Sequence, residues 1–236
     1  MAILAVNAGS SSLKFSLHPL RLGQVQPNVL SGNIEGLEPG GQPEMAWTFA
    51  GQPRREAVSG PGETPFVQAL ARLRELLAGL EGAPPITAVA HRVVHGGEDF
   101  RDSVLVTDAV LERLARLNSL APLHQPHNLA GIRSFRQAFP ALPQVACFDT
   151  AFHAGLSEVA SAFALPTALT EQGVRRYGFH GLSYHYIMDT LQERSPRAQG
   201  RVLMAHLGNG ASLCAARAGR SVPALSQSVG SSVDST

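Results

Sequence analysis

The segment from Asn7 to Lys14 combines small residues, hydroxyls and a cation in one short run, NAGSSSLK. Small residues allow backbone N–H groups to approach phosphate oxygens closely, and serine hydroxyls supply further hydrogen-bond donors. Lys14 is the single lysine of a chain that carries 18 arginines. The spacing differs from the Walker pattern, so that mechanism does not carry over. The run indicates an anion-binding turn, and an ordinary tight turn is the alternative that composition leaves open.

A second run, HRVVHGG over residues 91–97, offers two competing kinds of site. Two histidines four residues apart can share one zinc ion on a helix, but on a strand they lie about 13 Å apart. The preceding ITAVA is apolar and partly β-branched, which favours a strand and disfavours zinc. Arg92, at the end of a buried strand, therefore indicates an anion clamp, because ligands bind at strand ends in α/β sheets.

Two further segments place polar groups beside apolar ones. Asp149 follows the apolar stretch QVACF, which puts an acid at the end of a buried strand, although a helix cap or a turn aspartate is a common alternative. His180 lies between glycines and aromatic residues in RRYGFHGLSYHY, where a packed loop histidine is the alternative. His124 and His127 are too cramped to favour a metal pair.

Alternating strands and helices must position these residues. The periodicity predicts strands 2–7 and 13–18 around the serine turn, a helix opened by Thr64 and Pro65, and a strand ending near residue 95. Later elements are helices over 108–120, 128–139 and 182–194, and strands over 144–149 and 201–207. This order is typical of an α/β architecture with a mixed or parallel sheet.

One pattern occurs twice, about 200 residues apart. Residues 7–13 and 206–213 both read as a small-residue turn between apolar strands. The repeat suggests two related lobes that face one cleft, and two unrelated hairpins remain the other interpretation.

Composition narrows the class of protein. The formal net charge is +1, and the only adjacent basic pairs are Arg54-Arg55 and Arg175-Arg176, which disfavours a nucleic-acid partner. No apolar stretch approaches the ~20 residues of a membrane span, and the N-terminus lacks a signal-peptide pattern. The two cysteines form no disulfide or zinc pattern. We expect a cytoplasmic protein with no membrane or nucleic-acid partner.

Six segments together resemble the acetate kinase family, in that family's order and at its approximate spacing. They are NAGSSSLKF, AHRVVHGGE, PLHQPHN, FDTAFH, RRYGFHGLSYHY and HLGNGAS, and the resemblance runs from residue 1 to about 222. It implies the fold that actin, sugar kinases and heat-shock ATPases share, with duplicated lobes and an incomplete second lobe. Residues 1–150 are then the N-terminal α/β lobe with the first phosphate hairpin and acetate site, and residues 151–236 the start of a nucleotide-binding lobe.

The resemblance implies reversible phosphoryl transfer from ATP to acetate, with Mg²⁺ as cofactor and a homodimer as the assembly. The implied catalytic residues are Asp149, Arg92 and His180. The implied acetate-binding residues are Arg92, Val94, Leu123 and His124. The implied phosphate-binding residues are Ser10, Ser12, Lys14, His206, Gly208, Asn209 and Gly210, and Asn7 lies near the metal. A shared site requires the catalytic three to converge within about 10–12 Å.

We expect the resemblance to end after Val222. The family continues with Asp-Thr-Ser-Met-Gly, whereas no part of the family's sequence is recognised in residues 223–236. A second catalytic arginine, a magnesium-binding glutamate and the adenosine pocket are expected beyond that point. We therefore expect a truncated acetate kinase that is impaired by itself. The alternatives are a propionate or butyrate kinase of the same family, or a non-catalytic fragment.

Overall fold

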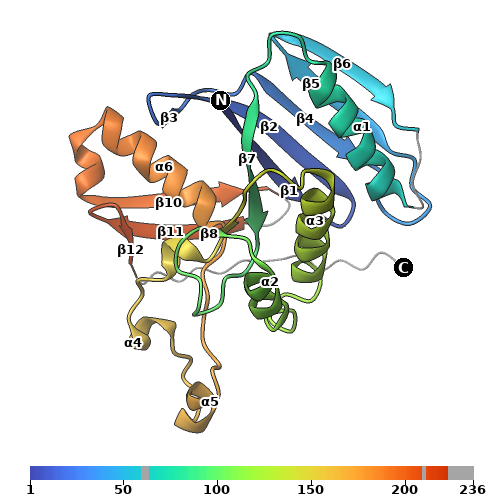
Figure 1. Ribbon diagram of the computed structural model, residues 1–236. Helices are drawn as coiled ribbons and strands as arrows, with labels where there is room; N and C mark the ends of the chain where they lie inside the picture. Colours follow the sequence, from blue (N-terminus) through green and yellow to red (C-terminus); the bar gives the residue numbers. More distant parts are fainter. Residues whose placement is uncertain (60–63, 209–210, 223–236) are drawn as a thin grey trace. The chain divides into compact units, whose positions relative to one another are not determined.

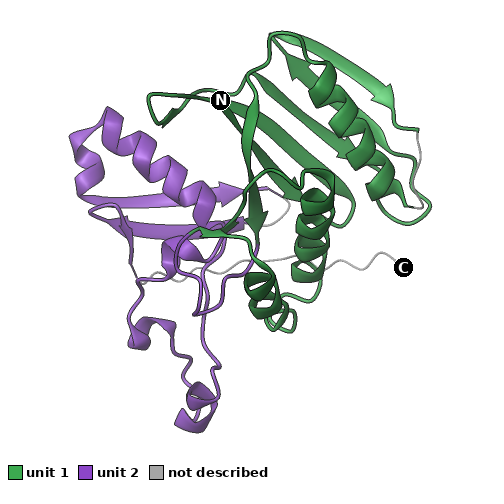
Figure 2. Cartoon of the chain, viewed as in Figure 1, with its two compact units in different colours: residues 1–93, 103–147 green, residues 94–102, 148–236 purple. Residues whose placement is uncertain are grey.

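The computed structural model describes residues 1–59, 64–208 and 211–222 (Figure 1). Two compact units make up the chain, residues 1–93 with 103–147 and residues 94–102 with 148–236 (Figure 2). The division into an acetate-binding lobe and a nucleotide-binding lobe stays a prediction.

A mixed sheet forms the first unit. Its strand order is β6-β5-β4-β2-β1-β7-β9-β8, and β3 pairs with β2 outside this path. The strands are β1 (Ala2–Ala8), β2 (Ser12–Arg21), β3 (Gln24–Val25), β4 (Leu30–Glu35), β5 (Glu44–Phe49), β6 (Gln52–Ala57), β7 (Ile86–Val93), β8 (Val104–Leu105) and β9 (Gln144–Phe148). Strands β1 and β2 are antiparallel, as the sequence predicts, and β1 pairs in parallel with β7.

Three helices belong to this unit: α1 (Pro65–Gly79), α2 (Asp108–Ala115) and α3 (Gln125–Ala138). The predicted start of α1 is confirmed, because the Thr64 side chain accepts a hydrogen bond from the Val67 N–H at 3.3 Å. Helix α2 ends five residues earlier than predicted, since the amides of Arg116 and Leu117 bond three residues back and form turns instead. Helix α3 begins three residues earlier than predicted, with Pro126 in its first turn, where a missing N–H costs nothing.

The core of the first unit follows the alternation of the strands. Leu4 and Val6 of β1 and Phe15 of β2 are buried against Leu73 of α1 and Phe135 of α3. Period-2 burial of this kind fixes the strand register, because a slip of one residue would turn every apolar side chain outward.

The second unit is smaller and built around one helix and a three-stranded sheet. Helix α6 (Gly181–Arg194) packs on strands β10 (Arg201–Leu207) and β11 (Ala211–Arg217), with Tyr184, Met188 and Met204 in the core, and β12 (Arg220–Ser221) pairs with β11. The shorter elements are η1 (Ala151–His153), α4 (Glu158–Ser161), α5 (Thr167–Glu171) and η2 (Pro196–Gln199). The predicted bounds of β10 are confirmed, and α6 begins one residue earlier than predicted.

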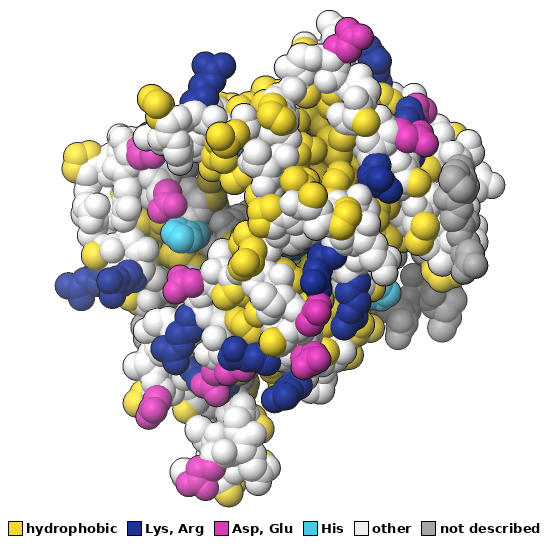
Figure 3. Space-filling model, in the orientation of Figure 1, with side chains coloured by type: hydrophobic (Ala, Val, Ile, Leu, Met, Phe, Trp, Pro, Cys, Tyr) yellow, Lys and Arg dark blue, Asp and Glu magenta, His cyan; other side chains and the backbone are white. Residues whose placement is uncertain are grey.

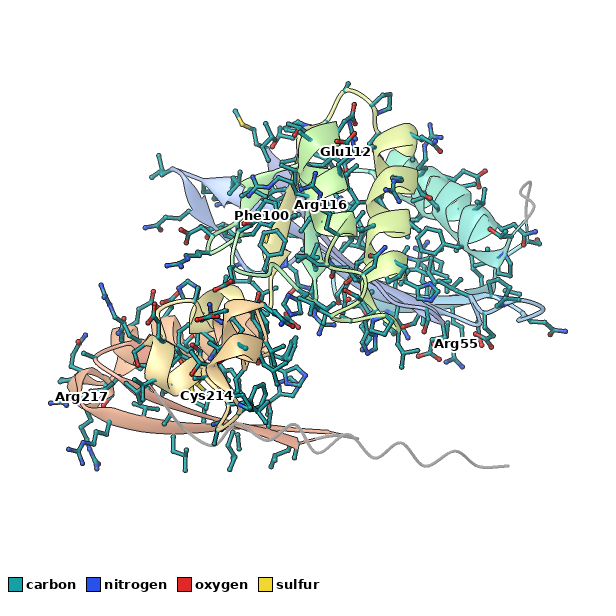
Figure 4. The ribbon with its side chains drawn as sticks, turned by 90° about the horizontal axis from the view of Figure 1, so that it is seen from below. Arg55, Phe100, Glu112, Arg116, Cys214 and Arg217 are labelled. Carbon is teal, nitrogen blue, oxygen red and sulfur yellow. The ribbon has the colours of Figure 1, made fainter. Side chains whose placement is uncertain are left out.

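Aromatic packing ties residues 94–102 to the second unit. Phe100 (Figure 4) stacks on Phe148 with ring centroids 5.2 Å apart, and the Gly96 N–H donates to the Thr150 hydroxyl at 3.0 Å. The His95 ring lies edge-on to Tyr177, with centroids 4.4 Å apart. These contacts are with residues after 147, so the segment belongs with them although it follows β7 in the chain.

The surface carries charges of both signs. On the face shown in Figure 3, lysine and arginine side chains are interspersed with aspartate and glutamate. None of the helices in the described ranges has the length and apolar character that crossing a membrane requires.

His91 is a polar side chain inside the first unit. It is 2% exposed, its Nε2–H donates to Gln144 Oε1 at 2.6 Å, and its ring meets Phe135 edge-on. Burial lowers the pKa of His91 from 6.5 to about 4, although the bond to Gln144 acts in the opposite direction. The imidazole is therefore a neutral donor in the folded chain.

This histidine should make the fold acid-sensitive. Below pH 6.5 the unfolded chain binds a proton at His91, whereas the folded chain does so only near pH 4, so stability is lost as pH falls through this window. The full shift corresponds to about 3 kcal/mol. We expect His91→Gln, which keeps a donor but does not titrate, to lose less unfolding free energy in urea between these pH values.

The matched control is His127→Gln, an exposed histidine of α3, which should keep the wild-type pH slope. An unchanged slope in His91→Gln would show that the acid sensitivity arises elsewhere.

Candidate active site

The serine turn near the N-terminus is the tip of a regular hairpin. Asn7 pairs with Lys14 and Ala8 with Leu13, and the Gly9 N–H donates to the Ser12 carbonyl at 2.8 Å. The predicted strand-turn-strand unit is therefore confirmed. Ser10 and Lys14 are exposed at this tip and Ser12 is half-buried, so hydroxyl and ammonium groups face solvent beside the backbone amides.

Arg92 lies beside this hairpin. The parallel register pairs Val6 of β1 with His91 of β7. The next residue of each strand, Asn7 and Arg92, therefore lies at the same end of the pair. Arg92 Nη1 donates to Asn7 Oδ1 at 3.4 Å, and both side chains are half-buried. The contact places a permanent positive charge next to the serine turn.

Helix α3 packs against Ala8, at the start of the same turn. Asn128 Nδ2 donates to the Ala8 carbonyl at 2.8 Å, and this bond is buried. One turn further along, a Cβ atom on Gly131 would lie 2.7 Å from the Ala8 methyl carbon, so only glycine permits this approach. Sequence reasoning missed both residues, although Asn128 ends the PLHQPHN segment that also supplies His124.

The residues expected around the acetate methyl group are divided between the units. Leu123 is 76% exposed and His124 is exposed at the start of α3, both in the first unit. Val94 is half-buried in the second unit. Their convergence on one pocket stays a prediction.

In the second unit, Asp149 lies directly after β9 and is 2% exposed. Its backbone carbonyl accepts the Gly181 N–H at 2.8 Å. A Cβ on Gly181 would overlap that carbonyl, and a Cβ on Gly178 would overlap the His153 ring. The two glycines flanking His180 are therefore needed for the loop to lie against Asp149 and His153.

His180 occupies a strained position at the start of α6. Its φ of 57° is in the left-handed region, which costs a non-glycine residue roughly 1–2 kcal/mol. Its Nδ1 hydrogen-bonds the Ser212 hydroxyl at 2.9 Å, and its ring stacks on His206 with centroids 4.2 Å apart and planes within 5°. Two of the residues expected at phosphate, His180 and His206, thus lie in direct contact.

Ser212 has a second partner in this network. The hydroxyls of Ser212 and Tyr184 are 2.5 Å apart, and both residues are buried. Burial raises the pKa of Tyr184, while its hydrogen bonds with Ser212 and with the backbone of His206 act in the opposite direction. Ser212 and Tyr184 lie in the segments HLGNGAS and RRYGFHGLSYHY, but neither was predicted as a site residue, because their contact joins a helix to a strand 28 residues away.

The other predicted site residues belong to different units or lie outside the described ranges. Gly208 is exposed at the end of β10, and Asn209 and Gly210 lie outside the described residues. Arg92 belongs to the first unit and Asp149 and His180 to the second, so the convergence of these three stays a prediction. Within the described ranges, no group of three or more His, Cys, Asp or Glu residues could hold a metal.

Comparison with known proteins identifies the chain. The family model described as the acetokinase family matches residues 2–230, which corrects the expected end of the resemblance after Val222. The chain belongs to the acetokinase family. Curated relatives include the acetate kinase of Rhizobium meliloti, 46% identical over 94% of this chain and 56% of that protein, and the propionate kinase of Citrobacter rodentium, 44% identical over 93% and 54%.

Solved structures of acetokinase-family members confirm the predicted fold class. A propionate kinase from Francisella tularensis aligns with a TM-score of 0.83 at 34% identity, and the acetate kinase of Porphyromonas gingivalis with 0.78 at 32%. Each alignment covers 94% of this chain and 56% of the other. The chain therefore spans little more than half the length of the family members it matches.

A substitution at Gly131 tests whether the close contact between α3 and Ala8 matters for stability. Gly→Ala in a helix usually stabilises by roughly 0.5–1 kcal/mol. At Gly131 the new methyl would lie 2.7 Å from the Ala8 methyl carbon, well inside the ~3.5–4.0 Å of carbon contacts. We expect Gly131→Ala to lower the free energy of unfolding in urea by about 1–3 kcal/mol.

The control is Gly79→Ala at the end of α1, where the added methyl meets no atom within 4 Å. It should leave stability unchanged or slightly raised. Equal effects at both positions would mean that the contact with Ala8 places no constraint on α3.

Proposed function

We propose that this chain carries the carboxylate-acceptor side of a phosphotransferase that moves the γ-phosphoryl group of ATP to acetate. The products are ADP and acetyl phosphate, and the reaction runs in both directions. The observation that carries the proposal is the Arg92 guanidinium held against Asn7 at the serine hairpin, where a cation and several donors face one turn. The relatives named acetate kinase support acetate as the acceptor.

The chemistry needs charge neutralisation more than proton transfer. An acetate oxygen forms the new bond to the γ-phosphorus while the bond from phosphorus to the ADP oxygen breaks, and no proton moves. A carboxylate is already a nucleophile, so no general base is required. The barrier comes from bringing two anions together and from charge on the transferring group, which positioned donors offset.

The side chains of this chain supply such donors. Arg92 offers a planar guanidinium that can bind a carboxylate or a phosphoryl group through two N–H bonds. The hairpin offers backbone amides with the Ser10 and Ser12 hydroxyls and the Lys14 ammonium. In the second unit, His180 and His206 offer imidazoles at the N-terminal end of α6.

Magnesium fits the oxygen donors of the chain. Mg²⁺ is usually held by one or two carboxylates together with substrate phosphates, not by a ready-made protein cage. Asp149 of the second unit offers a carboxylate oxygen and Asn7 of the first unit an amide oxygen, and the described ranges hold no group of three or more His, Cys, Asp or Glu residues. When bound with the nucleotide, the ion would neutralise phosphate charge; the assignment of Asp149 and Asn7 to it is part of this proposal.

Propionate is the second candidate acceptor. It rests on relatives and a solved structure that are named propionate kinases. Val94 and Leu123 are the residues expected at the acceptor's alkyl group, and one methylene changes binding by only ~1–3 kcal/mol. Comparison of kcat/KM for acetate and propionate decides between them. A homodimer and a cytoplasmic location stay predictions.

Arg92 provides the test of the acceptor role. A chimera joining residues 1–222 to the part of the Rhizobium meliloti acetate kinase that this chain does not span should form acetyl phosphate from ATP and acetate. In a hydroxamate assay, Arg92→Ala should lower kcat/KM by roughly 10²–10³, the usual loss for one group that stabilises transition-state charge. Arg92→Lys should recover only part, because a point charge replaces the planar fork.

Arg116→Ala is the matched control, because this arginine is exposed at the end of α2 in the same unit (Figure 4). It should retain the activity of the chimera. Full activity in Arg92→Ala would remove the proposed function from this site.

The 236-residue chain by itself should behave differently. It spans 56% of the length of the Rhizobium meliloti relative, and phosphoryl transfer needs groups around the whole transferring phosphate. We expect its acetyl phosphate formation to be at least about 10²-fold slower than that of the chimera. Equal rates would show that the chain's own residues are sufficient for catalysis.

A further inference from the structure

His153 lies inside the second unit, beside the loop that leads into α6. The residue is 7% exposed, and its Nε2 donates to the Phe179 carbonyl oxygen at 3.1 Å. The direction of this bond is fixed, because a carbonyl oxygen has no proton to give. At the other edge of the ring, Nδ1 lies 2.9 Å from the Ser221 hydroxyl of β12. Contacts at both edges therefore hold the plane of the ring.

The loop before α6 contacts one histidine through its backbone and another through its side chains. The rings of Tyr177 and Phe179 lie edge-on to the His95 ring, with centroids 4.4 and 5.6 Å away. Between them, a Cβ on Gly178 would overlap the His153 ring. His95 therefore packs against the side chains of the loop, and His153 lies directly against its main chain.

Two hydrogen bonds hold the peptide groups on either side of the His180 Cα. The peptide group before it includes the Phe179 carbonyl, which binds His153. The peptide group after it includes the Gly181 N–H, which donates to the Asp149 carbonyl at 2.8 Å. Peptide groups are planar, so fixing two successive planes fixes φ and ψ of the residue between them. Here the result is a φ of 57° and a ψ of 20°.

This conformation is one that His180 would not adopt without support. A left-handed backbone is strained for a residue with a side chain, and it persists only where contacts impose it. A change to an ordinary helical φ near −60° would be a rotation of roughly 120° about the N–Cα bond. It would separate the imidazole from its present contacts, Ser212 and His206. We propose that His153 is a positioning residue that fixes the peptide group before His180 and thereby orients the His180 imidazole.

The chemistry of an imidazole suits this role. Burial lowers the pKa of His153, although the bond to Phe179 and the charge of Asp149 act in the opposite direction. A neutral imidazole offers one donor and one acceptor at different edges of a rigid ring. With Nε2 donating to the loop, Nδ1 can accept from Ser221. The consequence for catalysis rests on the proposed function, because His153 would act on the phosphoryl group only through His180.

The wild-type 236-residue chain provides the first test. With ¹⁵N-labelled histidine at about pH 8, we expect the His153 proton on Nε2 and slower exchange of that proton with water than at exposed His185. We also expect a strong intraresidue NOE between the amide proton and Hα of His180, because these protons are nearly eclipsed at a φ of 57°. An unprotonated Nε2 on His153 overturns the inference.

Two substitutions separate hydrogen bonding from packing. His153→Gln keeps an N–H donor, whereas His153→Leu keeps the bulk of the side chain without one. The leucine variant should weaken the His180 NOE and speed exchange of the Gly181 amide by roughly 3–10-fold, as for loss of one hydrogen bond. The glutamine variant should keep both near the wild-type values. Wild-type values in the leucine variant, or equal changes in both variants, overturn the inference.

Two further variants complete this comparison. His185→Leu, at an exposed histidine of α6, is the matched control and should change neither the His180 NOE nor the Gly181 exchange rate. If His153→Leu does not fold, His153→Met takes its place, because methionine also lacks a donor and its flexible side chain adapts to irregular space.

The chimera described above tests the consequence for catalysis. We expect His153→Leu to lower kcat by roughly 10–10²-fold, the usual effect of a misplaced active-site group, with a smaller effect on KM for acetate. His153→Gln should recover most of the loss. An unchanged kcat in His153→Leu overturns the positioning role. A wild-type chimera without activity, in spite of the expected NMR results, counts against the proposed function and leaves the action of His153 on the backbone supported.

Discussion

The buried hydrogen bond from Asn128 to the Ala8 carbonyl is the constraint on which the first candidate phosphate turn depends. A hairpin tip of glycine and serine has little side-chain mass with which to hold its own shape. Asn128 donates to the Ala8 carbonyl in a buried hydrogen bond, and Gly131 allows the helix to come close enough to make that bond. The direction of the serine and backbone donors, and the reach of Arg92 to Asn7, follow from the resulting position of the tip.

In the second unit, glycines and one strained residue hold the loop before α6 in place. Gly178 and Gly181 let the loop lie against His153 and Asp149, and His180 takes a left-handed conformation between them. Local strain of this kind persists only where surrounding contacts determine the conformation. Here the Gly181 amide and the Ser212 hydroxyl make those contacts. In both units, the candidate site is held by short contacts to backbone and hydroxyl groups.

The sequence predicted elements whose cause is local. The strands around residues 7–14 alternate with period 2, and Thr64 with Pro65 marks a helix start, so both were predictable. The early end of α2 was not, because the apolar pattern continues through turns that bond three residues back. The assignment of residues 94–102 to the second unit depends on Phe100 stacking on Phe148, a contact that no periodicity encodes.

The same distinction applies to the candidate site. Ser10, Lys14 and Arg92 stood out because their types and spacing suggest anion binding before any fold is known. Asn128 and Ser212 did not, since each acts on a residue far along the chain, Ala8 at a separation of 120 residues and His180 at 32. Residue type reveals groups suited to contact a ligand, whereas the groups that orient them become visible only through the fold.

Helix α3 also limits where the chain can change in length. Its first turn begins beside His124, its second presents Asn128 to Ala8, and Gly131 follows on the same side. Each residue of an α-helix turns the chain by about 100°. A single insertion or deletion between residues 124 and 131 would therefore rotate Asn128 away from the hairpin even if the helix itself formed perfectly. Variation in length among related chains is compatible with this arrangement in the turns before His124, but not within these two helical turns.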